Sequence, residues 1–187
     1  MRVPVIAGNW KMYKTAAESA AFAKAFLPLV AGVSGVEIVL APPFPSIAPL
    51  AAALKGSGVG VASQNVHFAA EGAYTGEVSP AMVKDAGATY CIIGHSERRQ
   101  YFAEDDGSVN RKTRAALAAG LTPIACVGET LEERDQHLTD TIITVQVKGV
   151  PQMRKTLAQI AHAIGGVPGF ALPIDFPSSM SFARSAR

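Results

Sequence analysis

Short apolar runs alternate with amphipathic stretches along most of the chain, and this alternation limits the fold more than any other feature of the sequence. Each apolar run has the length of a buried strand, and the stretches between them have the spacing of helices that cover a sheet. The predicted strands are residues 3–8, 36–41, 59–63, 91–94 and 121–127. Five such units in succession predict a parallel sheet packed against helices, either as a barrel or as an open doubly wound sheet.

Residues that favour helix starts follow several of the predicted strands. Ser108 is expected to cap a helix that reaches Ala119, before Gly120 ends it. Thr130 and Glu133 have the spacing of a capping box. The helix that they open is expected to continue through apolar residues at helical spacing, namely Leu138, Ile142 and Val145.

Size and charge restrict the class of protein. The 187 residues, of which 49% are hydrophobic, suffice for one domain with a sizeable core. The net charge is +2 and neither Lys nor Arg forms a run, so the basic side chains are expected to form ordinary solvated surface. The apolar stretch in residues 1–9 is too short for a secretory signal, and no window of membrane-spanning length is free of Pro, Gly and charge. We therefore expect a soluble, cytoplasmic protein that binds neither nucleic acid nor a membrane.

The two cysteines, Cys91 and Cys126, both lie in apolar, strand-like runs. This placement favours two buried thiols in a reducing compartment over a disulfide, which is the alternative that two cysteines allow. The sequence contains no metal-spaced pair of Cys or His, no glycine-rich dinucleotide fingerprint and no Walker-type loop. The residues alone thus predict an α/β enzyme that binds a phosphate or a carbonyl group at the ends of its strands.

His95 occupies the point where a predicted strand passes into a helix, which Ser96 and Glu97 begin. A helix N-terminus favours anions and disfavours a positively charged imidazole. A neutral His95 could therefore donate a hydrogen bond to a substrate oxygen while Glu97 sets the local field. The alternative is a histidine that merely caps the helix.

Asn9 and Lys11 follow the first predicted strand in a similar way. Lys11 is either an ordinary surface lysine or a cation that faces a ligand, and its place just beyond a buried strand favours the second interpretation. The polar segment 64–77 is an unusually long loop, which predicts a functional role or contact with a partner. His67 within it is expected to be a plain loop residue.

Five motifs, in the same order and at the same spacing, resemble those of the triosephosphate isomerase family. They are AGNWK at 7–11, QNV at 64–66, GAYTGE at 72–77, IIGHSERR at 92–99 and CVGETLEER at 126–134. The resemblance covers residues 1 to about 145 and implies a (β/α)₈ TIM barrel, of which about five β/α units are recognisable. Residues 146–187 form a divergent tail, so we expect a single, incomplete barrel domain over residues 1–187.

The resemblance implies the interconversion of dihydroxyacetone phosphate and D-glyceraldehyde 3-phosphate through an enediolate, a step of glycolysis and gluconeogenesis. No metal or organic cofactor is implied. His95 resembles the electrophile that polarises the carbonyl, Lys11 the cation that balances the phosphate and the enediolate, and Glu97 the carboxylate held close to that lysine. Asn9 resembles a neighbouring substrate-binding donor. Thr75 resembles the loop residue that reaches the partner's site, which implies a homodimer.

The family's glutamate base, its glycine-rich lid and its last phosphate loops have no counterpart in this sequence. Beyond Asp140 the sole carboxylate is Asp175, which could stand in for the base. The tail predicts a helix with apolar residues at Met153, Leu157, Ile160 and Ile164, and at best one strand over 170–176. The chain is then either an isomerase that needs a base and a lid, or a noncatalytic fragment from a truncated or frame-shifted gene.

Overall fold

A computed structural model describes residues 3–148 and 181–184. The helix and the strand predicted in the tail, and Asp175 with them, lie outside the described residues.

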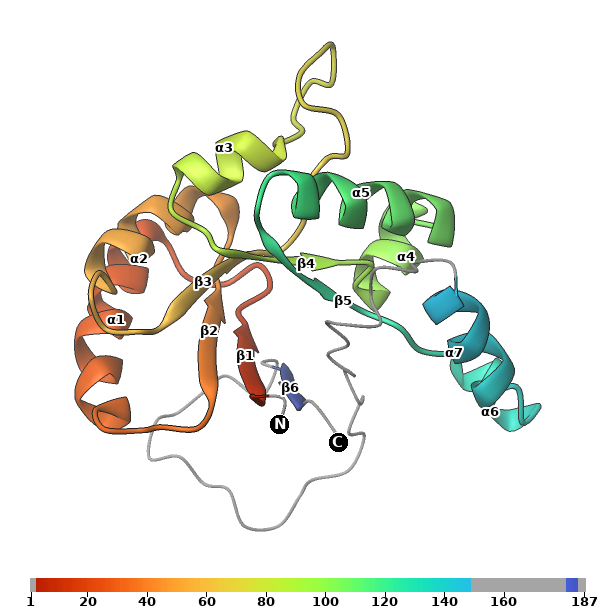
Figure 1. The fold of residues 1–187 in the computed structure, drawn as a ribbon, viewed down its shortest axis with the longest axis horizontal. Helices are drawn as coiled ribbons and strands as arrows, with labels where there is room; N and C mark the ends of the chain where they lie inside the picture. Colours follow the sequence, from red (N-terminus) through yellow and green to blue (C-terminus); the bar gives the residue numbers. More distant parts are fainter. Residues whose placement is uncertain (1–2, 149–180, 185–187) are drawn as a thin grey trace.

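Five parallel strands form a curved sheet, in which they lie side by side in the order in which they occur in the chain (Figure 1). They are β1 (Val5–Asn9), β2 (Glu37–Ala41), β3 (Gly60–Ser63), β4 (Tyr90–Ile93) and β5 (Thr122–Ala125). All five predicted strands are present, although β5 is shorter than the predicted run 121–127. A doubly wound sheet reverses its strand order at one point. The order of β1 to β5 does not reverse, so the winding is that of a barrel.

A sixth strand, β6 (Ser181–Arg184), pairs antiparallel with the edge of β1 that β2 does not cover. The sequence did not predict this strand. Arg184 lies opposite Ile6, and Ser181 lies opposite Asn9. An unpaired strand edge leaves backbone N–H and C=O groups without partners. β6 satisfies these groups on β1 but breaks the all-parallel pattern of the sheet.

Helices cover the outer side of the sheet, where α1, α2, α3 and α5 lie (Figure 1). The helices are α1 (Ala16–Val30), η1 (Phe44–Ser46), α2 (Ile47–Ala53), α3 (Pro80–Asp85), α4 (Ser96–Phe102), α5 (Asp106–Ala118), α6 (Leu131–Asp135) and α7 (Thr139–Lys148). Strand side chains alternate between two clusters. Val61 and Cys91 pack with the helices, whereas Ala62 and Ile92 pack on the opposite face of the sheet. The larger cluster, with Trp10 fully buried, forms the core.

The cap of α5 differs from the prediction: Asp105, and not Ser108, is the N-cap residue. The Asp105 carboxylate accepts the backbone N–H of Ser108 at 2.6 Å, and the Ser108 hydroxyl oxygen accepts the backbone N–H of Asp105 at 3.0 Å. Both residue types favour caps, and this reciprocal pairing satisfies two donors at once because the acid precedes the serine by three residues.

The helix predicted from Thr130 onward is interrupted. The capping box of Thr130 and Glu133 is confirmed, but α6 is only five residues long. His137 then adopts a left-handed conformation, with φ of 60°, and a second helix, α7, follows. Leu138 precedes α7, and its carbonyl accepts the backbone N–H of Ile142 at 2.9 Å. The apolar spacing continues across the turn, which is why the sequence pattern resembles one helix.

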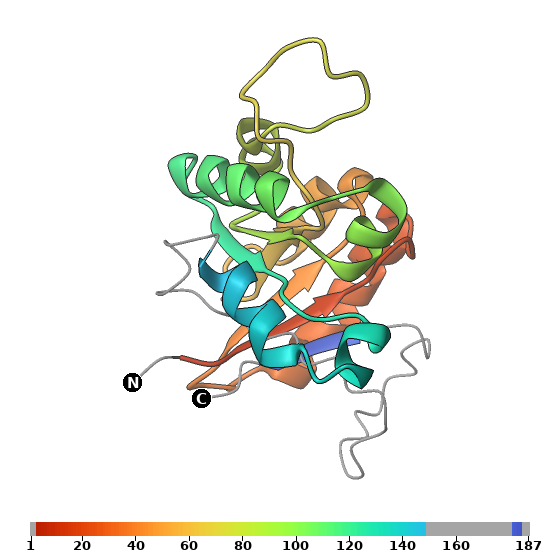
Figure 2. The ribbon, with the colours of Figure 1, turned by 90° about the vertical axis from the view of Figure 1, so that its right-hand side faces the viewer.

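The long loop between β3 and α3, residues 64–79, projects from one end of the molecule (Figures 1 and 2). It packs on itself: the ring of His67 lies 4.3 Å from that of Phe68 and 4.2 Å from that of Tyr74. The backbone N–H of His67 also donates to the carbonyl of Val78 at 2.8 Å. The predicted loop is thus a structured projection.

Both cysteines are buried and free, as predicted. Cys91 belongs to the cluster beneath the helices and Cys126 to the cluster on the opposite face, so the sheet separates them. Burial raises the pKa of both thiols, that of Cys91 to about 12. Neither is therefore a ready nucleophile at neutral pH.

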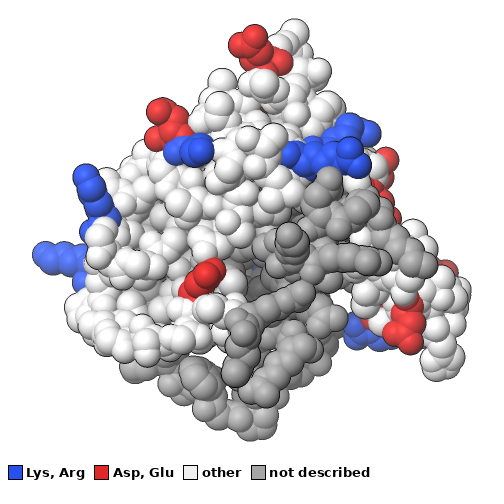
Figure 3. All heavy atoms as spheres, in the orientation of Figure 1, with Lys and Arg blue, Asp and Glu red and all other residues white. Residues whose placement is uncertain are grey.

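Lys and Arg side chains lie at separate places on the face that Figure 3 shows, several of them beside Asp or Glu. Within residues 3–148 and 181–184, none of the helices is both long enough and apolar enough to cross a membrane.

Candidate active site

Three side chains that the sequence singled out lie together at the carboxyl ends of β1 and β4. The ammonium of Lys11 is 2.7 Å from Oε1 of Glu97, and Oε2 of Glu97 is 3.5 Å from Nδ1 of His95. The Lys11 and Glu97 side chains are 26% and 40% exposed, whereas that of His95 is 7% exposed. The site thus combines a solvent-accessible ion pair with a buried imidazole.

The backbone of Lys11 is held in an unusual conformation, with φ of 51°. A residue with a side chain enters this left-handed region at a cost. Asn9, the last residue of β1, accepts the backbone N–H of Lys11 on its Oδ1 at 3.0 Å. Gln64 donates from Nε2 to the carbonyl oxygens of Lys11 and Ala41, both at 2.8 Å. Two amide side chains therefore maintain the turn that carries the cation.

His95 is the N-cap residue of α4, so the capping alternative is part of its role in the structure. Its Nδ1 accepts the backbone N–H of Glu97 at 3.2 Å. A nitrogen that accepts a hydrogen bond carries no proton, so a neutral His95 would bear its proton on Nε2. This tautomer, inferred from the hydrogen bond, has a donor on the ring nitrogen remote from the helix.

The arrangement can bind an anion beside a hydrogen-bond donor. An ammonium has three N–H donors, and an anion in solution can reach the partly exposed Lys11. An exposed ion pair such as that of Lys11 and Glu97 contributes little to stability, so its rearrangement by a ligand costs little. A phosphate or an enediolate oxygen near Lys11 would gain charge stabilisation, and the imidazole would supply a fixed donor.

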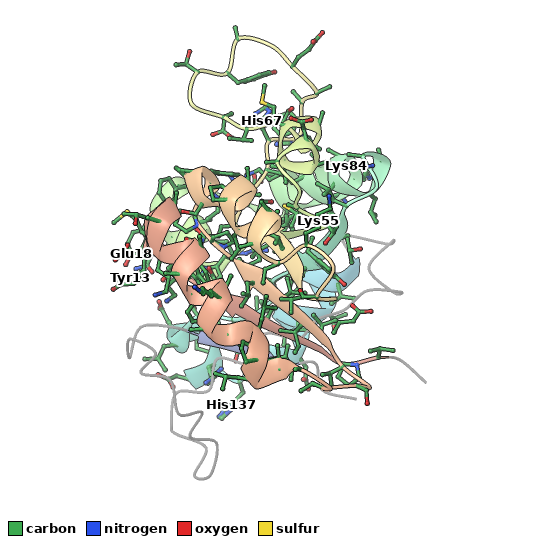
Figure 4. The ribbon with its side chains drawn as sticks, turned by 90° about the vertical axis from the view of Figure 1, so that its left-hand side faces the viewer. Tyr13, Glu18, Lys55, His67, Lys84 and His137 are labelled. Carbon is green, nitrogen blue, oxygen red and sulfur yellow. The ribbon has the colours of Figure 1, made fainter. Side chains whose placement is uncertain are left out.

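The other predicted residues lie elsewhere. Thr75 is exposed on the projecting loop. Figure 4 shows His67 and His137 at opposite ends of the molecule, so these two histidines do not form one site. Among the described residues, no group of three His, Cys, Asp or Glu side chains could hold a metal ion.

A buried charged cluster lies beside the site, although the sequence predicted that the basic side chains would be solvated. Lys112 is 6% exposed, and its ammonium donates to Oδ1 of Asn65 at 2.9 Å and contacts Glu104. The Glu104 side chain is 2% exposed, with Nε of Arg98 3.6 Å from its Oε1. Nothing in the spacing of these residues signals the cluster. It joins the start of the projecting loop to α5 and to the segment after α4.

Glu129, which follows the carboxyl end of β5, is a second carboxylate with little exposure, since its side chain is 6% exposed. It accepts hydrogen bonds from Nε of Arg134 at 2.7 Å and from the hydroxyl of Thr139 at 3.3 Å. A hydrogen bond from its own backbone and the Arg134 guanidinium hold the pKa of Glu129 below its usual value. The carboxylate thereby fastens α6 and α7 to the end of β5.

Comparison with known proteins shows the family to which the chain belongs. A family model described as triosephosphate isomerase matches residues 4–164. The chain belongs to the triosephosphate isomerase family. Residues of the five motifs, including His95 and Lys11, fall within the matched range.

Named members of the triosephosphate isomerase family are similar over most of this chain. The triosephosphate isomerase of Carboxydothermus hydrogenoformans is 53% identical over 147 residues, which are 79% of this chain and 59% of that protein. The triosephosphate isomerase of Pelobacter propionicus is 56% identical over 147 residues, with the same two coverages. This chain spans 59% of the length of each of these relatives.

A solved structure supports the fold. The crystal structure of the triosephosphate isomerase from Bartonella henselae matches with a TM-score of 0.75 and 40% sequence identity. The match covers 80% of this chain and 62% of that one. The fold is therefore that of the TIM barrel family, with five parallel strands and their helices forming half of a barrel in the described residues.

Proposed function

We propose that this chain acts on a triose phosphate and catalyses the interconversion of dihydroxyacetone phosphate and D-glyceraldehyde 3-phosphate. The observation that carries the proposal is the convergence of Lys11, Glu97 and His95 at the strand ends of a triosephosphate isomerase family member. Lys11 supplies a cation for the phosphate and the enediolate, and Asn9 holds its backbone. His95 donates from Nε2 to the substrate carbonyl, because its Nδ1 accepts a backbone N–H. Glu97 keeps the ammonium beside the imidazole.

The reaction also needs a base that removes a proton from carbon. General acid and base catalysis contributes about 10² to 10⁴ in rate, so a chain without a base would be severely impaired. Asp175 is our candidate, because it is the sole carboxylate after Asp140, and it lies outside the described residues. Asp175→Asn should abolish any turnover that the chain shows, and unchanged turnover would exclude Asp175 as the base.

The test of the function is the isomerisation rate of the purified chain, measured with D-glyceraldehyde 3-phosphate while circular dichroism verifies that the protein is folded. His95→Gln should remove the activity. His137→Gln is the matched control, because it makes the same substitution at an exposed histidine between α6 and α7. Absence of turnover from the folded chain would contradict the proposal and favour the noncatalytic alternative.

We further propose that the chain works in the cytoplasm as a homodimer that the projecting loop joins through Thr75. The loop exposes Thr75 and the ring of Tyr74 on a structured projection, which lowers the entropy cost of docking. Sedimentation of the chain beside Thr75→Glu tests this contact. The variant should shift the population toward monomer, and a chain that sediments as a monomer in both forms would contradict the proposal.

A further inference from the structure

The helix that follows His95 has no apolar anchor. None of the seven residues of α4 is buried, although α4 carries Glu97 and begins at the His95 cap. Surface helices are usually held by an apolar stripe that faces the core. The position of α4, and with it the geometry of His95 and Glu97, must therefore depend on polar contacts.

Arg99 supplies two of these contacts. Its Nε donates to the carbonyl oxygen of Gly94 at 3.0 Å, and its Nη1 donates to Oδ1 of Asp106 at 2.7 Å. Gly94 is the residue immediately before His95, and Asp106 is the first residue of α5. A single guanidinium thus joins the β4–α4 turn to the start of the next helix.

The residue that Arg99 holds is itself confined. Gly94 has φ of +74°, and a Cβ atom there would lie 2.8 Å from Cγ2 of Val109 and 3.3 Å from the carbonyl oxygen of Cys126. The turn is therefore wedged against α5 and against the segment after β5, and Arg99 fastens the carbonyl side of the same residue. Steric confinement and the guanidinium together fix where the chain leaves β4.

We infer that Arg99 is a positioning residue that sets the orientation of the His95 imidazole and the Glu97 carboxylate. The inference rests on the proposed function for its catalytic meaning. A guanidinium presents several donors in a rigid fork, so it can hold Gly94 and Asp106 at once, whereas an ammonium is a point charge on a flexible stem. Lys at this position would keep the charge and lose the fork.

The test observes His95 directly, by ¹⁵N spectra of the imidazole nitrogens in the histidine-labelled chain, with His95→Gln identifying the His95 signals. Arg99→Met should shift or broaden these signals. Arg114→Met is the matched control, because Arg114 is an exposed residue of α5. Asp106→Asn keeps the contact between Arg99 and Gly94, so it should shift the signals less than Arg99→Met.

His95 signals in Arg99→Met that match those of Arg114→Met would overturn the inference. If Arg99→Met does not fold, Arg99→Lys decides in the same way, with unchanged signals again overturning it. In a chain that isomerises, Arg99→Met should also lower kcat up to about 100-fold with a smaller change in KM, because small displacements of reacting groups cost that much. Shifted His95 signals in a chain without turnover would overturn the proposed function and leave the inference standing.

Discussion

The two ends of the parallel sheet differ in what their side chains do. At the carboxyl ends of the strands, the side chains of Gln64 and His95 are held by backbone groups of other residues. The backbone of Lys11 is held by the side-chain amides of Asn9 and Gln64. At the amino ends, the first residues of β2 to β5 line a cavity of about 350 Å³: Glu37, Gly60, Tyr90 and Thr122. In TIM barrels the carboxyl end carries function and the amino end carries stability. We therefore expect residues at the carboxyl end of this sheet to serve function and those at its amino end to serve stability.

The carboxyl end also contains a backbone conformation and buried charges that cost free energy. Lys11 has a positive φ there. Lys112 and Glu104 form a buried ion pair beside Asn65, which follows β3. The amino end has a simple polar pair, in which the Tyr90 hydroxyl donates to Oε2 of Glu37 at 2.7 Å. The comparison predicts large effects of substitutions at the carboxyl end and small ones at the amino end.

The largest expected effect on stability is that of Glu104→Gln. It removes the carboxylate from Lys112, which is 6% exposed, and breaking a buried ion pair costs about 3 to 5 kcal/mol. Urea unfolding measures the loss. Glu132→Gln, at an exposed position of α6, is the control. The double variant Glu104→Gln with Lys112→Met should recover part of the loss, and a double variant no more stable than the additive sum would contradict this account.

Lys11→Met should lower the isomerisation rate about 10²- to 10³-fold, as the loss of one group that stabilises developing charge does. The free energy of unfolding should change by less than about 1 kcal/mol, because the ion pair with Glu97 is partly exposed. Lys14→Met is a matched control, since Lys14 also has a left-handed backbone, with φ of 72°. An equal loss of rate in both variants would remove the functional distinction of Lys11.

Gly94→Ala should destabilise the chain by about 2 to 4 kcal/mol, from left-handed strain and from overpacking against Val109. Gly56→Ala is the control: its φ is +80°, but a Cβ there would meet no atom within 4 Å. It should show only the conformational part, about 1 to 2 kcal/mol. Similar thermal denaturation of the two variants would mean that the turn before His95 is not confined.

Tyr90→Phe, at the amino end, should cost only about 1 kcal/mol near neutral pH, through loss of the hydrogen bond to Glu37. Burial, followed by the hydrogen bond to Glu37, raises the pKa of Tyr90 to about 12. The unfolded phenol ionises near pH 10, so the unfolded state loses its proton first and stability falls between about pH 10 and 12.

The pH dependence of unfolding distinguishes Tyr90 from the other titrating groups. Tyr90→Phe should have a shallower alkaline decline than the unaltered chain, whereas Tyr101→Phe, at a side chain 69% exposed, should not. Cys91 contributes a decline that begins nearer pH 9 in all of these proteins, because burial raises the pKa of its thiol to about 12. Identical alkaline slopes for the two tyrosine variants would refute the assignment.

The sequence predicted local features well. The five strands follow from short apolar runs, and the box of Thr130 and Glu133 follows from three-residue spacing. Prediction of the α5 cap failed because Asp105 and Ser108 are both good caps, and only their reciprocal hydrogen bonds distinguish them. β6 was not predictable, because four residues become a strand only through the edge that β1 offers.

The candidate site was likewise predicted only in part. His95, Lys11 and Glu97 were singled out by their places at strand ends and by motifs that resemble a family, and the structure brings these three side chains together. The supports of the site were not predicted. Arg99 and Gln64 act through backbone carbonyls whose positions depend on the packing of several elements. A lysine as buried as Lys112 contradicts the usual preference of its residue type.

The bridge that Gln64 makes has a consequence for the order of folding. Its amide joins the carbonyls of Lys11 and Ala41, across 53 and 23 residues of chain. Contacts between distant residues form late, because loop closure must precede them. The turn at Lys11 can therefore reach its final geometry only after β1, β2 and β3 are side by side. Pulse-labelling hydrogen exchange should find the Lys11 amide protected after the amides of β1 and β2, and simultaneous protection would contradict this order.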